Sequence, residues 1–217
     1  MRFSPFLSVN ARGATLPTGI YAIVDTEVST GPLALLGDML AAGVRIVQLR
    51  AKAGVDRELV RAMHAVTTTA EARLIVNDDF DAALEADGWH GGQEDIVARD
   101  LAIMRARLGT RLLGVSCGTP EEARRAEAAG ADYVGTGPFA ATATKGDAGA
   151  PIGEAGLAAV VAAVRIPVVA IGGIDASNLA RVAQSGARMA AVISAIARAD
   201  DPRAMTEQLV HAWAAVR

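Results

Sequence analysis

The chain has 217 residues, a formal net charge of −3 and one cysteine. This length suits a single domain with a large core. The 21 Lys and Arg residues are scattered, so nucleic-acid binding through phosphate neutralisation is not expected. Cys117 alone allows neither an internal disulfide nor a cysteine-based zinc site, and it suits a reducing cytoplasm. No apolar run approaches the roughly 20 residues of a membrane span, and the start of the chain lacks the pattern of a secretory signal, so no membrane partner is expected.

Short apolar runs alternate with helical patterns along the chain. The strands are predicted, in order, at 20–24, 45–49, 73–77, 88–90, 112–116, 133–137, 167–173 and 189–194. Eight such strand–helix units without a linker predict parallel strands with right-handed crossovers, which most economically close into a single-domain (β/α)8 TIM barrel. The structural alternative is an open doubly wound sheet. The predicted division is an N-terminal extension at 1–18 and a catalytic barrel at 19–217.

Local signals mark where the helices of these units begin and end. Thr119, followed by Pro120 and two Glu residues, predicts an N-cap and the first turn of a helix over 120–130. Gly43, Gly130 and Gly186 each stand between a helical pattern and a predicted strand. Glycine can take the left-handed conformation that ends a helix, so these positions predict helix C-termini.

Polar residues collect where the predicted strands end, which in a barrel of this type is the face that carries the reactive groups. An apolar run at 74–76 leads directly into Asn77 and Asp78. An amide and a carboxylate at the end of a buried strand would be unexpected unless a cationic partner lies there. The same pattern recurs from one strand end to the next. The candidate residues are Gln48, Arg50, Lys52, Asn77, Asp78, Asp95, Ser116, Thr142, Thr144, Lys145, Gly173, Ile193 and Ser194.

The charges among these residues indicate a metal–phosphate ligand. Arg50, Lys52 and Lys145 suit a polyanion, and arginine can bind phosphate in bidentate fashion. Asp78 and Asp95 would repel a phosphate by roughly 4 kcal/mol per close pair at an effective dielectric of 20. Mg²⁺ held between the carboxylates reverses the sign of that interaction, because its preferred ligands are carboxylate, water and phosphate oxygens. The sequence therefore predicts Mg²⁺ as the cofactor.

A second anion site is predicted at the other side of the same mouth. Loops after the seventh and eighth strands of such barrels often bind phosphate through backbone N–H groups. Gly172 and Gly173 would allow the backbone to approach a ligand closely. A mouth with two anion sites suggests an enzyme that joins two phosphorylated small molecules.

The chain resembles the thiamine phosphate synthase family from Tyr21 to about Trp213. The resemblance rests on segments that occur in the family's order: "QLRAK" (48–52), "IVNDD" (75–79), "ADGWHGGQED" (86–95), "GVS" (114–116), "GADYVGTGP" (130–138) with "TATK" (142–145), "PVVAIGGI" (167–174) and "VISAI" (192–196). It implies a (β/α)8 barrel that joins 4-amino-2-methyl-5-hydroxymethylpyrimidine diphosphate to a thiazole phosphate carboxylate. The products would be thiamine phosphate and diphosphate, and the diphosphate would leave before the thiazole nitrogen attacks.

The resemblance also implies roles for the candidate residues. Asp78 and Asp95 would hold Mg²⁺. The pyrimidine diphosphate would be contacted by Gln48, Arg50, Lys52, Asn77, Ser116 and Lys145, of which Arg50, Lys52, Ser116 and Lys145 would also be catalytic. The thiazole substrate would be bound by Thr142 and Thr144, and its phosphate by Gly173, Ile193 and Ser194.

The sequence departs from the family at Ala140 and Ala141, where a loop is usually bulkier, and at Gly118, where a histidine is common. The segment from Asn77 to Asp95 is also about two residues short. Two alternative functions remain open: an isomerase like the related thiazole tautomerase, and a non-catalytic barrel that binds thiazole phosphate or thiamine phosphate. Self-association into a homo-oligomer is left open as well.

Overall fold

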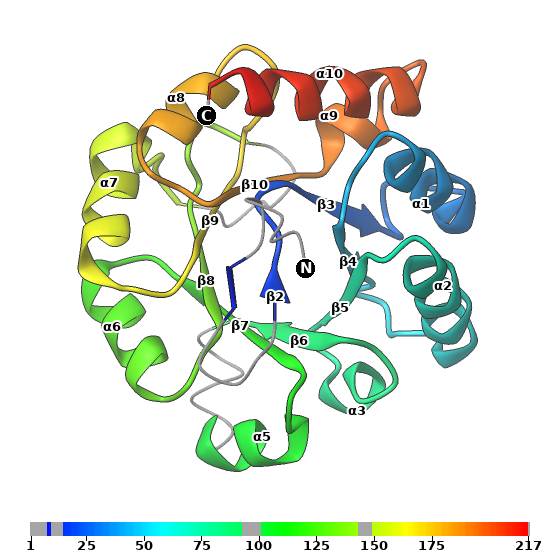
Figure 1. Cartoon of the computed structure of the whole chain (residues 1–217), viewed down its shortest axis with the longest axis horizontal. Coiled ribbons are helices and arrows are strands. Elements are labelled where there is room, and N and C mark those ends of the chain that lie inside the picture. The colour runs from blue at the N-terminus through cyan, green and yellow to red at the C-terminus, as the bar shows by residue number, and fades with distance from the viewer. Residues whose placement is uncertain (1–7, 10–14, 93–100, 143–148, 217) are drawn as a thin grey trace, which may run out of the picture.

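Parallel strands close into a barrel at the centre of the molecule (Figure 1). The computed structural model describes residues 8–9, 15–92, 101–142 and 149–216. The barrel strands, in their order around the ring, are β3 (Gly19–Asp25), β4 (Ile46–Arg50), β5 (Arg73–Asn77), β6 (Gly88–Gly91), β7 (Leu112–Cys117), β8 (Tyr133–Thr136), β9 (Val168–Ile171) and β10 (Met189–Val192). The ring closes because β10 pairs with β3, with Met189 opposite Gly19. The predicted (β/α)8 barrel is confirmed, and the doubly wound alternative is wrong.

Helices surround the strands on the outside, as Figure 1 shows. They are α1 (Pro32–Ala41), α2 (Arg57–Thr69), α3 (Phe80–Ala83), α5 (Leu101–Leu108), α6 (Pro120–Ala128), α7 (Gly153–Ala163), α8 (Leu179–Gln184), α9 (Ser194–Ala197) and α10 (Pro202–Ala215). Alternate strand residues such as Val47 and Leu49 point outward and pack with helix residues such as Leu36 and Met39 in the main core. Within the described part of the chain, no helix has both the length and the apolar character needed to cross a membrane.

The predicted helix signals are confirmed. Helix α6 begins at Pro120, and the Thr119 side chain caps it by accepting a hydrogen bond from the Glu122 backbone N–H. Gly43 and Gly130 follow helices and have φ angles of 102° and 94°. An L-residue with a β-carbon would be strained there, which is why glycine ends these helices.

The last two strands end earlier than predicted. The seventh predicted strand, 167–173, ends at Ile171 because Gly172 and Gly173 take φ angles of 93° and 64°. The eighth ends at Val192, and α9 starts at Ser194. Both breaks lie at the carboxyl end of the barrel, where the backbone leaves the ladder to form the pocket rim.

The barrel interior is apolar toward the amino ends of its strands and becomes polar toward their carboxyl ends. Inward-pointing residues of the apolar part include Ile23, Ile46, Ile75 and Met189. Because successive strand residues alternate between faces, the residues two positions further along β4 and β5 point inward as well. The pattern that fills the barrel with Ile46 and Ile75 therefore also turns polar residues into its mouth.

A short antiparallel ribbon precedes the barrel, formed by β1 (Ser8–Val9) and β2 (Thr15–Leu16). Leu16 is 1% exposed and belongs to the interior cluster of the barrel, together with Met189. Residues before Gly19 therefore contribute to the core of the barrel. Figure 1 shows β2 inside the outline of the strand ring.

Replacing Leu16 with alanine should lower the free energy of unfolding by about 2–4 kcal/mol, because the interior of a closed barrel can collapse little onto the resulting cavity. Chemical denaturation of the full chain would measure this change. Leu33→Ala is the matched control, since Leu33 is 44% exposed and its truncation should change stability by less than about 0.5 kcal/mol. Equal effects for the two variants would mean that Leu16 does not pack inside the barrel.

Candidate active site

A cavity of about 720 Å³ opens at the carboxyl ends of the barrel strands. It brings together most of the residues that the sequence singled out. Its walls include Gln48, Arg50, Lys52, Asn77, Asp78, Ser116, Thr142, Gly173, Ile193 and Ser194. The other three candidates, Asp95, Thr144 and Lys145, lie outside the described residues. The cavity is large enough for a drug-sized ligand.

The basic wall of the cavity comes from β4 and the turn after it. Gln48 and Arg50 are two residues apart in the strand and point into the barrel mouth, and Lys52 follows the strand. Arg50 is oriented by Asp25 at the end of the neighbouring β3: its Nη1 donates to Asp25 Oδ2 over 2.5 Å. The Asp25 carboxylate is 1% exposed and also accepts from the Glu27 backbone N–H at 2.9 Å. A buried arginine–carboxylate pair of this kind holds the guanidinium in one direction before any ligand arrives.

Asp25 is not among the site residues predicted from the sequence. The signal was nevertheless present, because the apolar run at 20–24 leads directly into a carboxylate, as the run before Asn77 and Asp78 does. Its role differs from the one proposed for Asp78, since Asp25 is buried and paired with Arg50, whereas the Asp78 side chain is exposed at the pocket.

Asp78 is held in an unusual backbone conformation. Its φ is 62°, a value that few non-glycine residues adopt and that Asp and Asn tolerate best. Its N–H donates to the His90 carbonyl at 2.9 Å, and its carbonyl accepts from Trp89 Nε1 at 3.0 Å. The two hydrogen bonds to β6 fix this backbone, which places the Asp78 carboxylate at the cavity rather than in a helix cap. The next residue, Asp79, is the N-cap of α3 and accepts from the Ala82 N–H.

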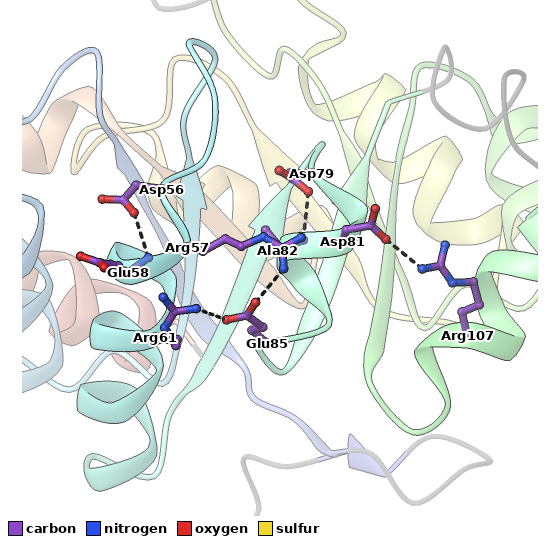
Figure 2. Close-up of polar contacts among 9 residues, drawn as sticks. All are labelled: Asp56, Arg57, Glu58, Arg61, Asp79, Asp81, Ala82, Glu85 and Arg107. Atoms are coloured by element: carbon purple, nitrogen blue, oxygen red, sulfur yellow. Dashed lines mark hydrogen bonds and ion pairs between the residues drawn. The ribbon is translucent and has the colours of Figure 1, made fainter.

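The short helix α3 behind Asp78 is anchored on both sides by surface ion pairs, shown in Figure 2. Arg57 and Arg61 of α2 contact Glu85 at 2.8 and 2.9 Å. On the other side, Arg107 of α5 contacts Asp81 at 2.8 Å. Exposed pairs contribute little individually. Together they tie the turn after β5 to its two neighbouring helices.

A buried chain of hydrogen bonds forms the floor of the cavity. His90 of β6 connects the Tyr133 hydroxyl, 3.1 Å from Nδ1, with the Ser116 hydroxyl, 3.0 Å from Nε2. Burial lowers the pKa of His90 to about 4, so the imidazole is neutral at pH 7. Burial also raises the pKa of Tyr133 well above its usual value. Of these three residues only Ser116 was a predicted site residue.

Cys117, next to Ser116, is unsuited to nucleophilic chemistry. Its side chain is buried, and burial raises the pKa of the thiol to about 12. Because the thiolate is the reactive form of cysteine, this thiol is inert near pH 7. Ser116 and Cys117 both line the cavity, but the Ser116 side chain is exposed there whereas that of Cys117 is buried.

The glycine-rich edge of the cavity packs against the loop that leads to Thr142. A β-carbon on Gly173 would lie 2.6 Å from the Ala141 carbonyl oxygen, and one on Gly172 would lie 2.7 Å from Pro138. The loop is fastened to this edge by the Ala140 N–H, which donates to the Gly172 carbonyl at 3.0 Å. Only glycine permits so close an approach, and the contact sets the width of the cavity between the two walls.

Comparisons with known proteins agree with the barrel fold. The family described as thiamine monophosphate synthase (TMP-TENI) matches residues 20–196. A thiamine-phosphate synthase of Moorella thermoacetica is 48% identical over 198 residues, covering 88% of this chain and 93% of that protein. One of Herpetosiphon aurantiacus is 45% identical and covers 88% and 95%. The solved structure of a thiamine phosphate pyrophosphorylase from Pyrococcus furiosus superposes with a TM-score of 0.83 at 33% identity, covering 92% and 96%. The chain therefore belongs to the thiamine monophosphate synthase family.

Proposed function

We propose that the cavity joins 4-amino-2-methyl-5-hydroxymethylpyrimidine diphosphate to thiazole phosphate, giving thiamine phosphate and diphosphate, with CO₂ as a further product where the thiazole enters as its carboxylate. Family membership makes the chain a thiamine-phosphate synthase, a transferase of thiamine biosynthesis. The observation that carries the assignment of the site is one cavity with a basic wall at Arg50 and Lys52 and a glycine edge at Gly172 and Gly173. Two anionic substrates can be bound in it at once.

The pyrimidine diphosphate is assigned to the basic wall. Arg50 is already oriented by Asp25, so its remaining donors are fixed toward the cavity without a loss of side-chain entropy on binding. Lys52 adds a second positive charge at the rim. Lys145, which lies outside the described residues, is proposed as a third. Gln48, Asn77 and Ser116 line the wall on which the pyrimidine ring would lie.

Magnesium is proposed as the cofactor, bound by Asp78 and Asp95. Within the described residues no group of three or more His, Cys, Asp or Glu side chains could hold a metal. Mg²⁺ does not require such a group, because one or two carboxylates, substrate phosphate oxygens and waters complete its octahedron. The exposed Asp78 carboxylate at the cavity fits this ligand set. The ion would neutralise charge on the diphosphate as it leaves.

The thiazole phosphate is assigned to the opposite edge, at Gly173, Ile193 and Ser194. The positive φ angles of Gly172 and Gly173 turn the backbone out of β9 at the rim of the cavity. Backbone N–H groups at such a turn can bind phosphate oxygens. Thr142, with Thr144 outside the described residues, is proposed to contact the thiazole between the two phosphate sites.

The proposed reaction needs no protein nucleophile. The carbon–oxygen bond to the diphosphate breaks with the electron pair leaving on oxygen, and the thiazole nitrogen then supplies the pair for the new carbon–nitrogen bond. Cys117 and His90, the nucleophile and base candidates in the described wall, are both unsuited, since the thiol stays protonated and the imidazole is buried. Catalysis therefore consists of stabilising the departing charge and holding the nitrogen in line.

Incubating the purified full chain with both substrates and Mg²⁺ should give thiamine phosphate and diphosphate in equal amounts, measured by chromatography. Each substrate alone is the control and should remain unchanged. Conversion of the thiazole phosphate to its isomer without coupling would support the tautomerase-like isomerase instead. Tight binding of both ligands without turnover would support the non-catalytic barrel. A cytoplasmic location is proposed from the single reduced cysteine.

A further inference from the structure

Five polar side chains from five different strands form one continuous chain of hydrogen bonds across the interior of the barrel. The chain connects opposite walls of the cavity. In order, it runs from Gln48 Nε2 to the Tyr21 hydroxyl (3.1 Å), to the Tyr133 hydroxyl (2.9 Å), to His90 Nδ1 (3.1 Å), and from His90 Nε2 to Ser116 Oγ (3.0 Å).

This chain of hydrogen bonds lies within the barrel interior. Tyr21 is 2% exposed and Tyr133 is completely buried, and both lie in the apolar interior cluster. Burying a hydroxyl there is costly unless it is hydrogen-bonded. The barrel makes room for the chain at Gly114, where a β-carbon would lie 2.3 Å from the Tyr133 hydroxyl oxygen and 2.5 Å from His90 Nδ1. Tyr21 and Tyr133, with the space left by Gly114, thus connect the hydrogen bonds from one wall of the cavity to the other.

The donor at one end sets the direction of every bond in the chain. An amide nitrogen donates only, so Gln48 Nε2 makes the Tyr21 oxygen an acceptor, and the Tyr21 hydrogen is left for Tyr133. The Tyr133 hydrogen in turn goes to His90 Nδ1. A neutral imidazole that accepts at Nδ1 carries its hydrogen on Nε2, which donates to Ser116.

We propose that Gln48, Tyr21, Tyr133 and His90 are positioning residues that form a directional relay, which holds His90 in the Nε2–H tautomer and fixes Ser116 as a hydrogen-bond donor on the cavity side. The Ser116 oxygen accepts from His90, so its own hydrogen is directed away from the imidazole. At the other end the amide oxygen of Gln48 is not used by the relay. The relay therefore gives the two walls opposite polarity, an acceptor on β4 and a donor on β7.

This inference rests on the proposed function for its consequence, since it deepens the account of how the same cavity recognises its ring substrate. A heterocycle with a donor on one side and an acceptor on the other would match the relay only in one orientation. The reverse relay, which starts from the Gln48 amide oxygen, turns every bond around. It would place the imidazole hydrogen on Nδ1 and make Ser116 donate to His90.

The tautomer can be measured directly in the ligand-free full chain. The chain has three histidines, so two-bond ¹H–¹⁵N spectra of uniformly ¹⁵N-labelled protein give three imidazole patterns. His90→Gln assigns the pattern of interest by its loss. We expect Nε2 to be protonated and Nδ1 to be an acceptor. A predominant Nδ1–H form, or an imidazolium at pH 7, would overturn the proposal without any variant being needed.

Variants then test whether the five hydrogen-bonded side chains of the relay act as a unit. Tyr21→Phe touches neither His90 nor Ser116, yet it should shift the His90 nitrogens toward a mixture of tautomers, because Tyr133 loses the bond that fixes its hydrogen. Tyr133→Phe should do so more strongly. Ser116→Ala should keep the Nε2–H form, since Ser116 lies at the receiving end. If Tyr21→Phe fails to fold, Gln48→Met provides a second test, because it removes the hydrogen bond from Gln48 to the Tyr21 hydroxyl.

The matched control is Thr206→Val, which removes a buried hydroxyl from α10, a helix on the outside of the barrel; this hydroxyl donates to the Pro202 carbonyl and is not part of the relay. It should leave the His90 pattern unchanged. A His90 pattern that is also unchanged in Tyr21→Phe and in Gln48→Met would show that the direction is not transmitted and would overturn the relay.

Kinetics separate the relay from the proposed function. Tyr21→Phe should lower kcat/KM for the pyrimidine diphosphate about tenfold, as expected for one misdirected hydrogen bond. An Nε2–H tautomer in a protein that forms no thiamine phosphate would contradict the function and leave the relay intact. An active enzyme with the reverse tautomer would contradict the relay alone.

Discussion

Replacing Arg50 with alanine is expected to lower kcat/KM by about 10²–10³ and to destabilise the fold at the same time. The loss of rate follows from removing a preorganised donor to a developing anion. The loss of stability follows because Asp25, which is 1% exposed, would lose its 2.5 Å ion-pair partner. Breaking a buried ion pair from one side typically costs about 3–5 kcal/mol.

The two effects can be separated with a second substitution. Asp25→Asn combined with Arg50→Ala removes the buried charge, so the double variant should recover most of the stability and none of the activity. Steady-state kinetics and chemical denaturation of the full chain measure the two quantities independently. Recovery of activity in the double variant would mean that Arg50 acts only through the fold.

A similar ion pair at the other end of the barrel provides the matched control. Arg105 of α5 contacts Asp132 at 2.7 Å, and their side chains are 10% and 2% exposed. Asp132 accepts from the Leu113 N–H near the amino ends of the strands, away from the cavity. Arg105→Ala should therefore destabilise the chain to a similar extent while leaving kcat/KM of the folded protein within about twofold. If Arg50→Ala also lowered stability but left kcat/KM within about twofold, Arg50 would have no role in substrate binding or catalysis.

The barrel could be predicted from the sequence because its signals are local. Residues 73–77 were predicted as a strand and form β5 with the same bounds. An apolar run followed by a helical pattern and a glycine such as Gly130 specifies one strand–helix unit, and eight units leave few topologies. The pocket wall followed from the same periodicity, because Gln48 and Arg50 must share a face of their strand.

Contacts that depend on which residues of distant strands meet could not be predicted in the same way. Tyr21 and Tyr133 are 112 positions apart, and their hydroxyls touch only because the barrel closes with one particular register. Nothing in either strand pattern distinguishes such a tyrosine from one that packs apolar neighbours. The ribbon formed by Ser8–Val9 and Thr15–Leu16 was missed for a different reason: strands of two residues are too short to show a period.

The placement of Asp95 and Lys145 stays a prediction, since both lie outside the described residues. The proposed magnesium site must therefore be tested from the side of Asp78. Its neighbour Asp79 makes this possible, because the two acids are adjacent in sequence and differ in what they face. Asp79 caps α3, whereas Asp78 lines the cavity.

Removing divalent metal with EDTA is expected to stop product formation, and Asp78→Asn is expected to raise the Mg²⁺ concentration for half-maximal activity roughly 10–100-fold, because the site loses a charged ligand. Asparagine tolerates the φ of 62° at this position, so the effect reports charge and not backbone strain. Asp79→Asn is the control and should leave the Mg²⁺ requirement unchanged, since asparagine caps a helix as well as aspartate does. Full activity in excess EDTA would rule out the metal.

Calorimetry with the pyrimidine diphosphate provides a test that does not depend on turnover. Without Mg²⁺ the Asp78 carboxylate repels the diphosphate, so Asp78→Asn should bind it at least as tightly as the unmodified chain does. With Mg²⁺ the order should reverse, because the carboxylate then attracts the ligand through the ion. A residue that merely shapes the pocket would weaken binding by the same factor in both conditions. The crossover in affinity is therefore the result that a metal-bridging role for Asp78 requires.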